Sequence, residues 1–535
     1  MRARLSGERF DVAIIGGGIN GVAIARECAR AGKRTLLVEQ NDFASGTTSR
    51  STRIIHGGLR YLEHGELGLV RESLKERERM LADYPHLVRP LRFVLAIPKA
   101  SRHNALAIRT GLLLYRKLAG ARCLPALAQF DAHLDRPDLA TFDYDDAQCE
   151  FPERLVAEWL GEAIAAGAVV RNHCTALGLT KNDGRVTGLV IHDTLTGTEA
   201  RVEAAHVINA TGPWADMVCA QSGVETKEKL LGGIRGSHIV LPRFPGAPGS
   251  AVYSEAPDGR PVFLIPWNDQ LLVGTTEVPD SADPARAEPS PEEVGYLLDS
   301  VNHLYPAANI GAGDILYAFA GVRPLPYSPT AKPAAITRRH RIHDHSDDGA
   351  RGLYSVIGGK LTTAAALARE VARKLGAHVP EPQTALIAPA PADGIEVTLR
   401  QWARQISAVA HIPEHSARAV AEWHGRRAMC VARMAGTDDA LRHPLCPHSS
   451  HIVAEAVEVA RYECAVTLGD ILLRRVPVAL SGCWSKQCTR AAAQRIGWAL
   501  GWDQLRIGRE AELFDAERAA FLKKPSGLSR PQRAA

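Results

Sequence analysis

The stretch of sequence that decides the fold is FDVAIIGGGINGVAIARECARAGKRTLLVE, residues 10–39. Residues 10–15 are apolar and rich in β-branched side chains, which is typical of a buried parallel strand. A glycine-rich turn follows at residues 16–21, a helical stretch runs to Ala31, and residues 35–39 have the pattern of a second strand. This order of strand, glycine turn, helix and strand predicts a Rossmann-like α/β unit.

The glycines of this unit have the spacing G-x-G-x-x-G, and each has its own role. Gly16 permits a tight turn, Gly18 lets the backbone approach a pyrophosphate, and Gly21 lets the helix lie close to the sheet. The pyrophosphate then lies at the helix N-terminus, where free N–H groups and the helix dipole favour negative charge. Glu39, at the end of the second strand, can accept hydrogen bonds from a ribose. The combination predicts a dinucleotide-binding site.

Three later segments favour FAD over NAD as the dinucleotide. Residues 47–53 form a polar loop, residues 207–212 form an apolar strand that ends in small residues, and residues 355–363 read as strand, glycine turn and helix start. The last of these offers N–H donors to the negative charge that a reduced flavin accumulates. The residues of these segments expected to bind the cofactor are Thr47, Ser49, Gly212, Gly358, Gly359 and Thr362.

Composition excludes several classes of protein. Of the 535 residues, 46% are hydrophobic and 23% are charged, which is ordinary globular composition with enough apolar material for a large core. The 64 Lys and Arg residues nearly balance the 59 Asp and Glu residues, so we expect no nucleic-acid partner. No apolar run approaches the roughly 20 residues that a membrane span needs.

The ten cysteines are scattered without a C-x-x-C pair, which favours a reducing compartment over a disulfide framework. His443, Cys446, His448 and His451 lie close together, but their spacing fits no standard zinc pattern, so no metal is expected. The strand pattern begins at Phe10 and leaves no room for a signal peptide. We therefore expect a cytoplasmic protein, and the Ala- and Arg-rich composition favours a bacterial one.

At IHGGLRYLE, residues 55–63, the sequence resembles the FAD-dependent, aerobic glycerol-3-phosphate dehydrogenase family. One departure is that Ala364 and Ala365 stand where the family often has Tyr-Arg. The other segments that carry the resemblance are IGGGINGVAIA (15–25), NATGPWAD (209–216), GSHIVLPR (236–243), IPWNDQLLVGTTEV (265–278), AGVRPL (320–325), AITR (335–338) and GGKLTT (358–363).

The resemblance implies that sn-glycerol 3-phosphate is oxidised to dihydroxyacetone phosphate and that electrons pass from reduced FAD to a membrane quinone. His238 is the candidate base, because an unperturbed imidazole titrates near pH 6.5. Arg323 is expected to stabilise charge on the developing ketone oxygen. A phosphate dianion needs fixed cations and hydrogen-bond donors. The residues implied to bind the substrate are Arg60, Tyr61, Lys360 and Arg338.

The expected fold class is α/β: a Rossmann-like FAD-binding domain with a discontinuous β-sheet substrate domain, followed by a helical C-terminal domain. The FAD-dependent oxidoreductase region is predicted at residues 1–387, with the substrate domain at roughly 226–320. The Pro/Ala-rich residues 388–394 are predicted to be a linker before a helical domain at 395–535. Periodicity predicts helices at 397–410, 417–434, 452–475 and 490–500, and places Glu463, Asp470, Arg474 and Arg475 on one of them.

Residues 89–122 contain eight basic residues and no acidic one. Arg102, Arg109 and Arg116 recur every seven positions, which places them on one side of a helix beside Leu106, Leu113 and Leu118. Such a segment can lie on an anionic lipid surface, here the inner face of the bacterial cell membrane. A solvated basic face or an RNA-adherent patch is the alternative. The basic residues are Arg89, Arg92, Lys99, Arg102, Arg109, Arg116, Lys117 and Arg122.

Other functions stay open at this stage. A glycerol-3-phosphate oxidase would use oxygen as its acceptor, and a flavin amine or amino-acid oxidase would need a carboxylate site instead of a phosphate site. A flavin-binding scaffold without turnover is the third alternative. The oligomeric state is also open, a homodimer included.

Overall fold

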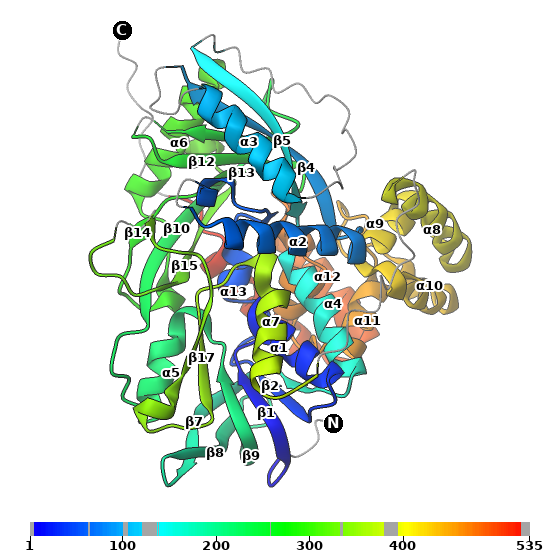
Figure 1. Ribbon diagram of the computed structural model, residues 1–535. Coiled ribbons are helices and arrows are strands. Elements are labelled where there is room, and N and C mark those ends of the chain that lie inside the picture. Colours follow the sequence, from blue (N-terminus) through cyan, green and yellow to red (C-terminus); the bar gives the residue numbers. More distant parts are fainter. Residues whose placement is uncertain are drawn as a thin grey trace.

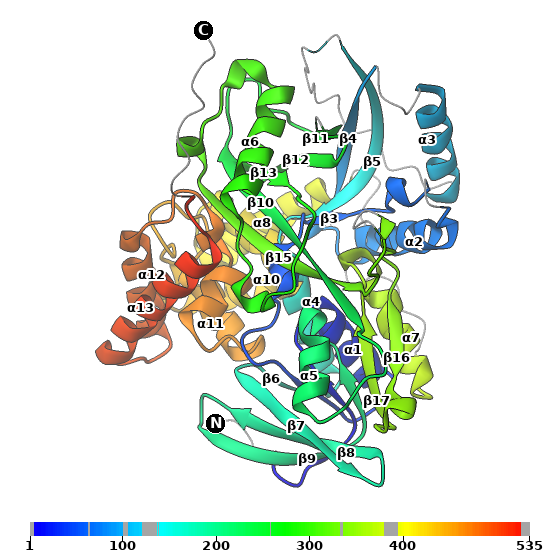
Figure 2. The ribbon, with the colours of Figure 1, turned by 90° about the vertical axis from the view of Figure 1, so that its left-hand side faces the viewer.

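The computed structural model describes residues 5–62, 65–99, 105–119, 136, 138–256, 258–331, 335–378 and 394–525. Two β-sheets lie at opposite ends of the part of the molecule that precedes the C-terminal helices, and these helices pack beside them (Figures 1 and 2).

The first sheet has eight strands and contains the glycine-rich unit. Strand β1 lies between β2 and β9 and is parallel to both, as an α/β unit requires. Helices α1 (Ile19–Arg30), α4 (Pro152–Ala165) and α7 (Ala364–Lys374) cover one face, and β7 and β8 fold over the other. The strands are β1 (Arg9–Ile15), β2 (Thr35–Val38), β6 (Val169–Arg171), β7 (Cys174–Asn182), β8 (Arg185–Asp193), β9 (Thr198–Asn209), β16 (Arg341–Asp344) and β17 (Leu353–Ile357). The predicted Rossmann-like fold is confirmed.

The second sheet has nine strands, and some of them lie outside residues 226–320, the range expected for the substrate domain. Three of its strands come from the first 149 residues, and β11 pairs in parallel with β4 across the gap in sequence. Local patterns miss this sheet because the pairing joins distant segments. The strands are β3 (Ile54–Ile55), β4 (Val88–Pro98), β5 (Leu139–Cys149), β10 (Leu231–Pro242), β11 (Ala251–Glu255), β12 (Pro261–Trp267), β13 (Gln270–Gly274), β14 (Val278–Pro279) and β15 (Tyr317–Pro326).

The helices beside the second sheet are α2 (Leu67–Asp83), α3 (Ala105–Ala119) and α6 (Pro291–Leu304). Helix α5 (Ala215–Gln221) lies next to the first sheet. Residues 88–98 are a strand, so the basic segment 89–122 is not one amphipathic helix. Arg89 pairs with Glu396 and Glu422, and Arg92 pairs with Asp143, so both are engaged within the protein. Arg102 and Arg122 lie outside the described residues.

The C-terminal part is helical, with two corrections. The helix expected at 417–434 is two helices that meet at Gly425, which has a φ of +47°. The helix expected at 452–475 ends at Tyr462, so Glu463 does not share a helix with Asp470. Most of the linker at 388–394 lies outside the described residues. The elements are α8 (Ile395–Ala410), α9 (Glu414–His424), α10 (Ala428–Thr437), α11 (Val453–Tyr462), the π-helix η12 (Asp470–Arg475), α12 (Lys486–Ala499) and α13 (Gln504–Phe521).

Buried ion pairs join the C-terminal helices to the first sheet. Both Nη atoms of Arg475 donate to the Asp42 carboxylate at 2.8 Å, and Arg154 Nη1 donates to Glu463 at 2.6 Å. Such pairs fix the geometry of an interface because separating them leaves uncompensated buried charge. Within the described ranges, none of the helices combines the length and the apolar character that crossing a bilayer requires.

Candidate active site

A cavity of about 970 Å³ begins at the glycine turn after β1 and is lined by residues of both sheets. Gly21, the third glycine of the turn, is not among the residues that line this cavity. The sequence-predicted site residues that line the cavity are Gly16, Gly18, Glu39, Thr47, Ser49, Arg60, Tyr61, Gly212, His238, Arg323, Arg338, Gly358, Gly359, Lys360 and Thr362. The fold therefore brings segments that are up to 346 residues apart in the sequence, from Gly16 to Thr362, to one site.

The glycine turn depends on two residues that tolerate no side chain. Gly16 has a φ of +104°, which disfavours a residue with a Cβ atom. A Cβ atom on Gly21 would lie 1.8 Å from the carbonyl oxygen of Gly16, so the helix can approach the turn only because this position is glycine. The hydroxyl of Thr48, which the sequence analysis did not single out, accepts a hydrogen bond from the backbone N–H of Ile19.

Three predicted cofactor ligands already make internal hydrogen bonds. Glu39 accepts one from the backbone N–H of Gly17 at 2.7 Å through Oε2, and one from Asn41 at 2.9 Å through Oε1. Burial raises the pKa of the Glu39 carboxyl. The hydroxyls of Thr47 and Ser49 donate to backbone carbonyls. Glu39 still has lone pairs that can accept hydrogen bonds from a ribose. The hydroxyl groups of Thr47 and Ser49 already donate their hydrogens to the backbone, so they could only accept a hydrogen bond from a cofactor.

The remaining predicted cofactor residues shape the backbone around the cavity. Gly212, Gly358 and Gly359 all have positive φ values, of 62°, 75° and 94°. The Thr362 hydroxyl accepts a hydrogen bond from the backbone N–H of His56 at 3.2 Å and thereby joins the 358–363 segment to the HGGLRY segment.

Two arginines and a lysine converge on the wall of the cavity. Arg323 Nη2 donates to the Thr275 hydroxyl at 2.9 Å, and burial together with the charge of Arg338 lowers its pKa to about 10. Arg338 forms an ion pair with Glu277 at 2.7 Å, and its Nη1 atom is buried without a hydrogen-bond partner among the described residues. The guanidinium groups of Arg323 and Arg338 bring positive charge to this wall.

Lys360 makes no described hydrogen bond through its side chain, although the charges of Asp146, Glu72 and Glu66 partly offset the effect of burial on its pKa. Its Nζ atom is buried and has no hydrogen-bond partner in the described part of the chain. Burial lowers its pKa to about 7, against an ordinary value of 10.5. The Nζ atom lies 4.6 Å from the centroid of the Tyr61 ring, a cation–π contact that replaces only part of the lost hydration. Arg60 precedes Tyr61 on the short helix η2 (Leu59–Leu62) and also lines the cavity.

His238 lies on β10, and its ring stacks on Phe319 with centroids 5.0 Å apart. Its Nε2 atom is 3.0 Å from the Thr52 hydroxyl, whereas Nδ1 has no described partner. Burial, and then the charges of Arg323 and Arg53, lower its pKa to about 3. The sequence analysis used the unperturbed value, so the structure corrects it: His238 is a neutral imidazole at neutral pH.

Sequence reasoning missed several residues of the cavity wall. His56 directly follows β3, and burial, followed by the charge of Lys360, lowers its pKa to about 3. It belongs to the HGGLRY segment, so the motif itself was the available signal. Glu517 and Phe521 reach the cavity from α13, and no local pattern indicates that the last helix returns to the cofactor.

The lining of the cavity includes α3 and a set of apolar side chains. Three residues of α3, Ala107, Ile108 and Gly111, line the cavity. On the same helix the side chains of Leu106 and Leu113 are 74% and 65% exposed. Apolar and aromatic residues that line the same cavity include Phe93, Leu95, Ile97, Tyr144, Tyr253 and Phe263.

Comparison with known proteins places this geometry in a family. Residues 11–374 match the family model for FAD-dependent oxidoreductases, and residues 383–507 match that for the C-terminal domain of alpha-glycerophosphate oxidase. A glycerol-3-phosphate dehydrogenase of Synechocystis sp. is 37% identical over 94% of this chain and 95% of its own length. D-erythritol 1-phosphate dehydrogenase of Brucella abortus is 33% identical over 69% of this chain and 72% of its own.

A solved structure agrees. The glycerol-3-phosphate dehydrogenase of Bacillus halodurans, complexed with FAD, covers 98% of this chain and 97% of its own length, at 25% identity and a TM-score of 0.76. Fold and site together define a FAD-dependent oxidoreductase. Within that class, this chain belongs to the glycerol-3-phosphate dehydrogenase family.

FAD, the cofactor of this protein, fits the residues that are present. The glycine turn offers a close backbone approach beside the start of α1, and the buried Oδ1 atom of Asn20 has no partner among the described residues. Gly212 would meet no atom within 4 Å if it carried a Cβ, so its Cα faces open space in the cavity. An elongated cofactor can therefore lie from Glu39 past Gly212 toward Gly359.

Proposed function

We propose that this chain oxidises sn-glycerol 3-phosphate to dihydroxyacetone phosphate and passes the electrons to a membrane quinone. The observation that carries the proposal is the buried Nζ atom of Lys360, which has no described hydrogen-bond partner and lies close enough to Arg338 for the two charges to repel, as those of Arg338 and Arg323 also do. Buried cations that repel one another are stabilised by a multiply charged anion. A phosphate ester supplies that anion, and an amino acid does not.

The phosphate is held by Lys360, Arg338 and Arg60, with the Tyr61 hydroxyl as a further donor. Burial raises the pKa of Tyr61, so the phenol keeps its proton and donates a hydrogen bond. The free Nη1 atom of Arg338 supplies a guanidinium donor that Glu277 does not occupy. Fixed donors of this kind orient the three-carbon chain so that C2 faces the cofactor.

His238 accepts the proton of the 2-hydroxyl group, and Arg323 stabilises the negative charge that develops on that oxygen. FAD, when bound, accepts the hydride that leaves C2. His238 is neutral, so one of its ring nitrogens has a lone pair for the proton. The imidazolium that then forms is disfavoured by the neighbouring arginine, and the substrate phosphate offsets that repulsion.

The apolar residues that line the cavity, Ile108 of α3 among them, support a lipid-soluble acceptor. Exposed Leu106 and Leu113 share α3 with Arg109, Arg116 and Lys117, a combination that binds an anionic lipid surface without crossing it. A quinone that entered beside α3 would meet aromatic and aliphatic side chains on its way to the cofactor. The exposed leucines and basic residues of α3 support attachment of the protein to the inner face of the cell membrane without a membrane-spanning segment.

A longer polyol phosphate is the second candidate substrate. D-erythritol 1-phosphate dehydrogenase is a relative, and the polar residues Glu255 and Arg260 also line this cavity. These side chains can bind the hydroxyl of a fourth carbon. The phosphate site is the same for both candidates, so chain length alone separates them.

Anaerobic titration of the FAD-loaded protein tests the proposal. Glycerol 3-phosphate, erythritol phosphate and an amino acid are added in turn, and bleaching of the flavin absorption band is followed. We expect glycerol 3-phosphate to bleach the band at the lowest concentration, and bleaching by the amino acid alone refutes the phosphate site. The reduced protein is then mixed with oxygen or with a quinone analogue, and faster re-oxidation by oxygen identifies an oxidase instead.

A further inference from the structure

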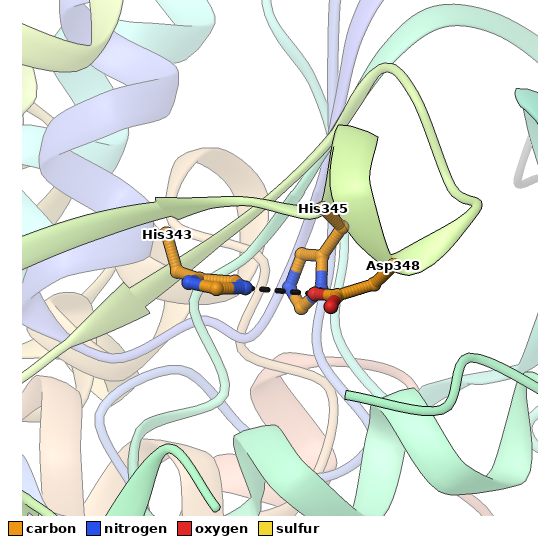
Figure 3. Close-up of side chains that lie close together, drawn as sticks. All are labelled: His343, His345 and Asp348. Carbon is orange, nitrogen blue, oxygen red and sulfur yellow. Dashed lines mark hydrogen bonds and ion pairs between the residues drawn. The ribbon is translucent and has the colours of Figure 1, made fainter. Parts of the chain in front are cut away.

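Two histidines and an aspartate form a cluster at the edge of the first sheet that the proposed activity does not use (Figure 3). His343 is on β16, and His345 and Asp348 are on the short helix η8 (His345–Asp348) that follows it. His343 Nε2 lies 2.8 Å and His345 Nδ1 lies 2.9 Å from the same carboxylate oxygen, Oδ2 of Asp348. Three ligand atoms from six consecutive residues therefore converge on one point.

We propose that this cluster binds a divalent transition-metal ion, with zinc as its best occupant. Two imidazoles and one carboxylate are ligands that zinc accepts, and a water molecule would complete a tetrahedron. Bonds of about 2.0–2.1 Å place tetrahedral ligands about 3.3 Å apart. The Asp348 oxygen therefore needs to separate from each nitrogen by only a few tenths of an ångström, and the two nitrogens lie within 4.8 Å of each other.

The neighbours of the cluster hold its members in the form that a metal needs. His345 Nε2 lies 2.8 Å from the Ser355 hydroxyl, which can accept its proton and leave Nδ1 free to bind the ion. The backbone N–H of Lys227 donates to Asp348 Oδ1, which leaves Oδ2 for the ion. His345 is fully buried, whereas the side chain of His343 is 26% exposed, so an ion can enter from solvent on that side.

A second group of histidine and aspartate side chains lies elsewhere in the described residues, and it differs from this cluster in having positively charged neighbours. Asp42, His173 and Asp470 also lie close together, but the guanidinium groups of Arg474 and Arg475 donate to the two carboxylates. Those carboxylates are already neutralised by fixed cations. Asp348 has no arginine or lysine side chain among its described partners, so its charge is available to a metal ion.

The position of the cluster gives the ion a structural role. Cys219 of α5 lies 3.7 Å from the Ser355 hydroxyl that supports His345. Met217, Val218 and Gln221 of the same helix line the cofactor cavity. A bound ion would therefore stabilise the β16–β17 edge and α5 beside one end of the FAD site.

Zinc binding to the full-length, FAD-loaded protein tests the inference. The wild-type protein and the variants His343→Gln and Asp348→Asn are treated with a chelator, dialysed against zinc and measured for bound metal per chain and by titration calorimetry. His303→Ala, which removes a partly exposed histidine elsewhere, is the matched control, and magnesium replaces zinc in a second series. Cysteines contribute equally to all four proteins, so the difference between them isolates the cluster.

We expect one zinc ion on the wild-type and control proteins, with affinity reduced at least about tenfold in His343→Gln and Asp348→Asn. Zinc should also raise the melting temperature of the wild-type protein more than that of the variants, because it binds only the folded state. Magnesium should bind to none of them. Equal zinc affinity in wild type and both variants, or no zinc on the wild type, would overturn the inference. Flavin reduction by glycerol 3-phosphate is measured in parallel, so a failure here is distinct from a failure of the proposed function.

Discussion

The Nζ atom of Lys360 lies 4.6 Å from the centre of the Tyr61 ring, buried and without a hydrogen-bond partner among the described residues. Burial is the main reason that its pKa falls to about 7. A position that holds a charge so unfavourably in the free protein is suited to gain an anionic ligand. The first two predictions follow from this relationship.

Replacing Lys360 with methionine should raise KM for glycerol 3-phosphate by about a hundredfold, with a smaller effect on kcat, because the phosphate contact forms before the transition state. In the wild-type protein KM should rise above about pH 7, by up to about tenfold per pH unit, because the substrate binds the protonated lysine. Steady-state kinetics across this pH range measure both effects. Lys360→Arg is the control: its charge persists, so a rise in KM with pH that survives in this variant contradicts the assignment.

The same variant should make the substrate-free protein more stable. The pKa of Lys360 is about 7 in the folded state and 10.5 as its ordinary value, so folding buries a charge at and below pH 7 and this cost fades as the pH rises toward 10.5. Lys360→Met should therefore raise the melting temperature at pH 7 by roughly 2 °C. The gain should shrink at higher pH. A loss of stability at pH 7 would show that Lys360 has a stabilising partner in the free protein.

His238→Ala should slow anaerobic flavin reduction by about 10²–10⁴-fold while substrate affinity changes little. The neutral imidazole of His238 is the proposed proton acceptor, and its removal leaves the phosphate contacts intact. Stopped-flow absorbance at saturating substrate measures the rate. His56→Ala is the matched comparison, because His56 is also a buried neutral imidazole on the cavity wall. If only the His56 variant loses the rate, the base is His56.

Asp42→Asn should destabilise the protein by about 3–5 kcal/mol, because it removes the ion-pair partner of the buried Arg475 guanidinium and one of the carboxylates that pair with Arg474. Asp42 is three residues from Glu39, so weaker retention of FAD should accompany the loss. Denaturant unfolding and release of flavin fluorescence measure the two effects. The exposed pair Arg92–Asp143 is the control, and Asp143→Asn should cost less than about 1 kcal/mol. Equal losses in both variants would mean that the C-terminal helices do not depend on Asp42.

Changing Leu106 and Leu113 on α3 to serine should weaken binding to anionic liposomes and slow reduction of a quinone analogue in membranes. Turnover with a soluble dye should stay within about twofold, since neither side chain lines the cavity. Liposome flotation at low salt measures the binding. Leu505→Ser is the matched control, because Leu505 is 84% exposed on another helix. Unchanged flotation of the α3 variant would rule out α3 as the membrane contact.

Local sequence patterns predicted the part of the fold that local interactions determine. The spacing of Gly16, Gly18 and Gly21 predicted a strand, a turn and a helix in register, and the fold and its FAD cofactor are confirmed. The site was harder to predict from local patterns, because its residues come from distant segments that only the resemblance to the glycerol-3-phosphate dehydrogenase family connects. Their roles remain predictions.

Features that depend on distant contacts were not predictable. The break at Gly425 lies against the ring of His86, more than 300 residues away in the sequence, and a Cβ atom there would lie only 2.6 Å from that ring. The pKa of His238 could not be taken from its ordinary value, because the burial and the neighbouring arginines arise only when β10, β15 and the loop at Thr52 assemble. Likewise, nothing near Asp42 in the sequence indicates its pairing with Arg475.

The central claim is that this FAD-bearing cavity recognises a three-carbon substrate by its phosphate. The most direct test compares anaerobic flavin bleaching in the wild-type protein by glycerol 3-phosphate and by glycerol, which differ only in that group. We predict rapid, complete bleaching by glycerol 3-phosphate at micromolar to millimolar concentration and at least about 10³-fold lower efficiency with glycerol. Equal efficiency of the two compounds, or no bleaching by glycerol 3-phosphate, would contradict the account.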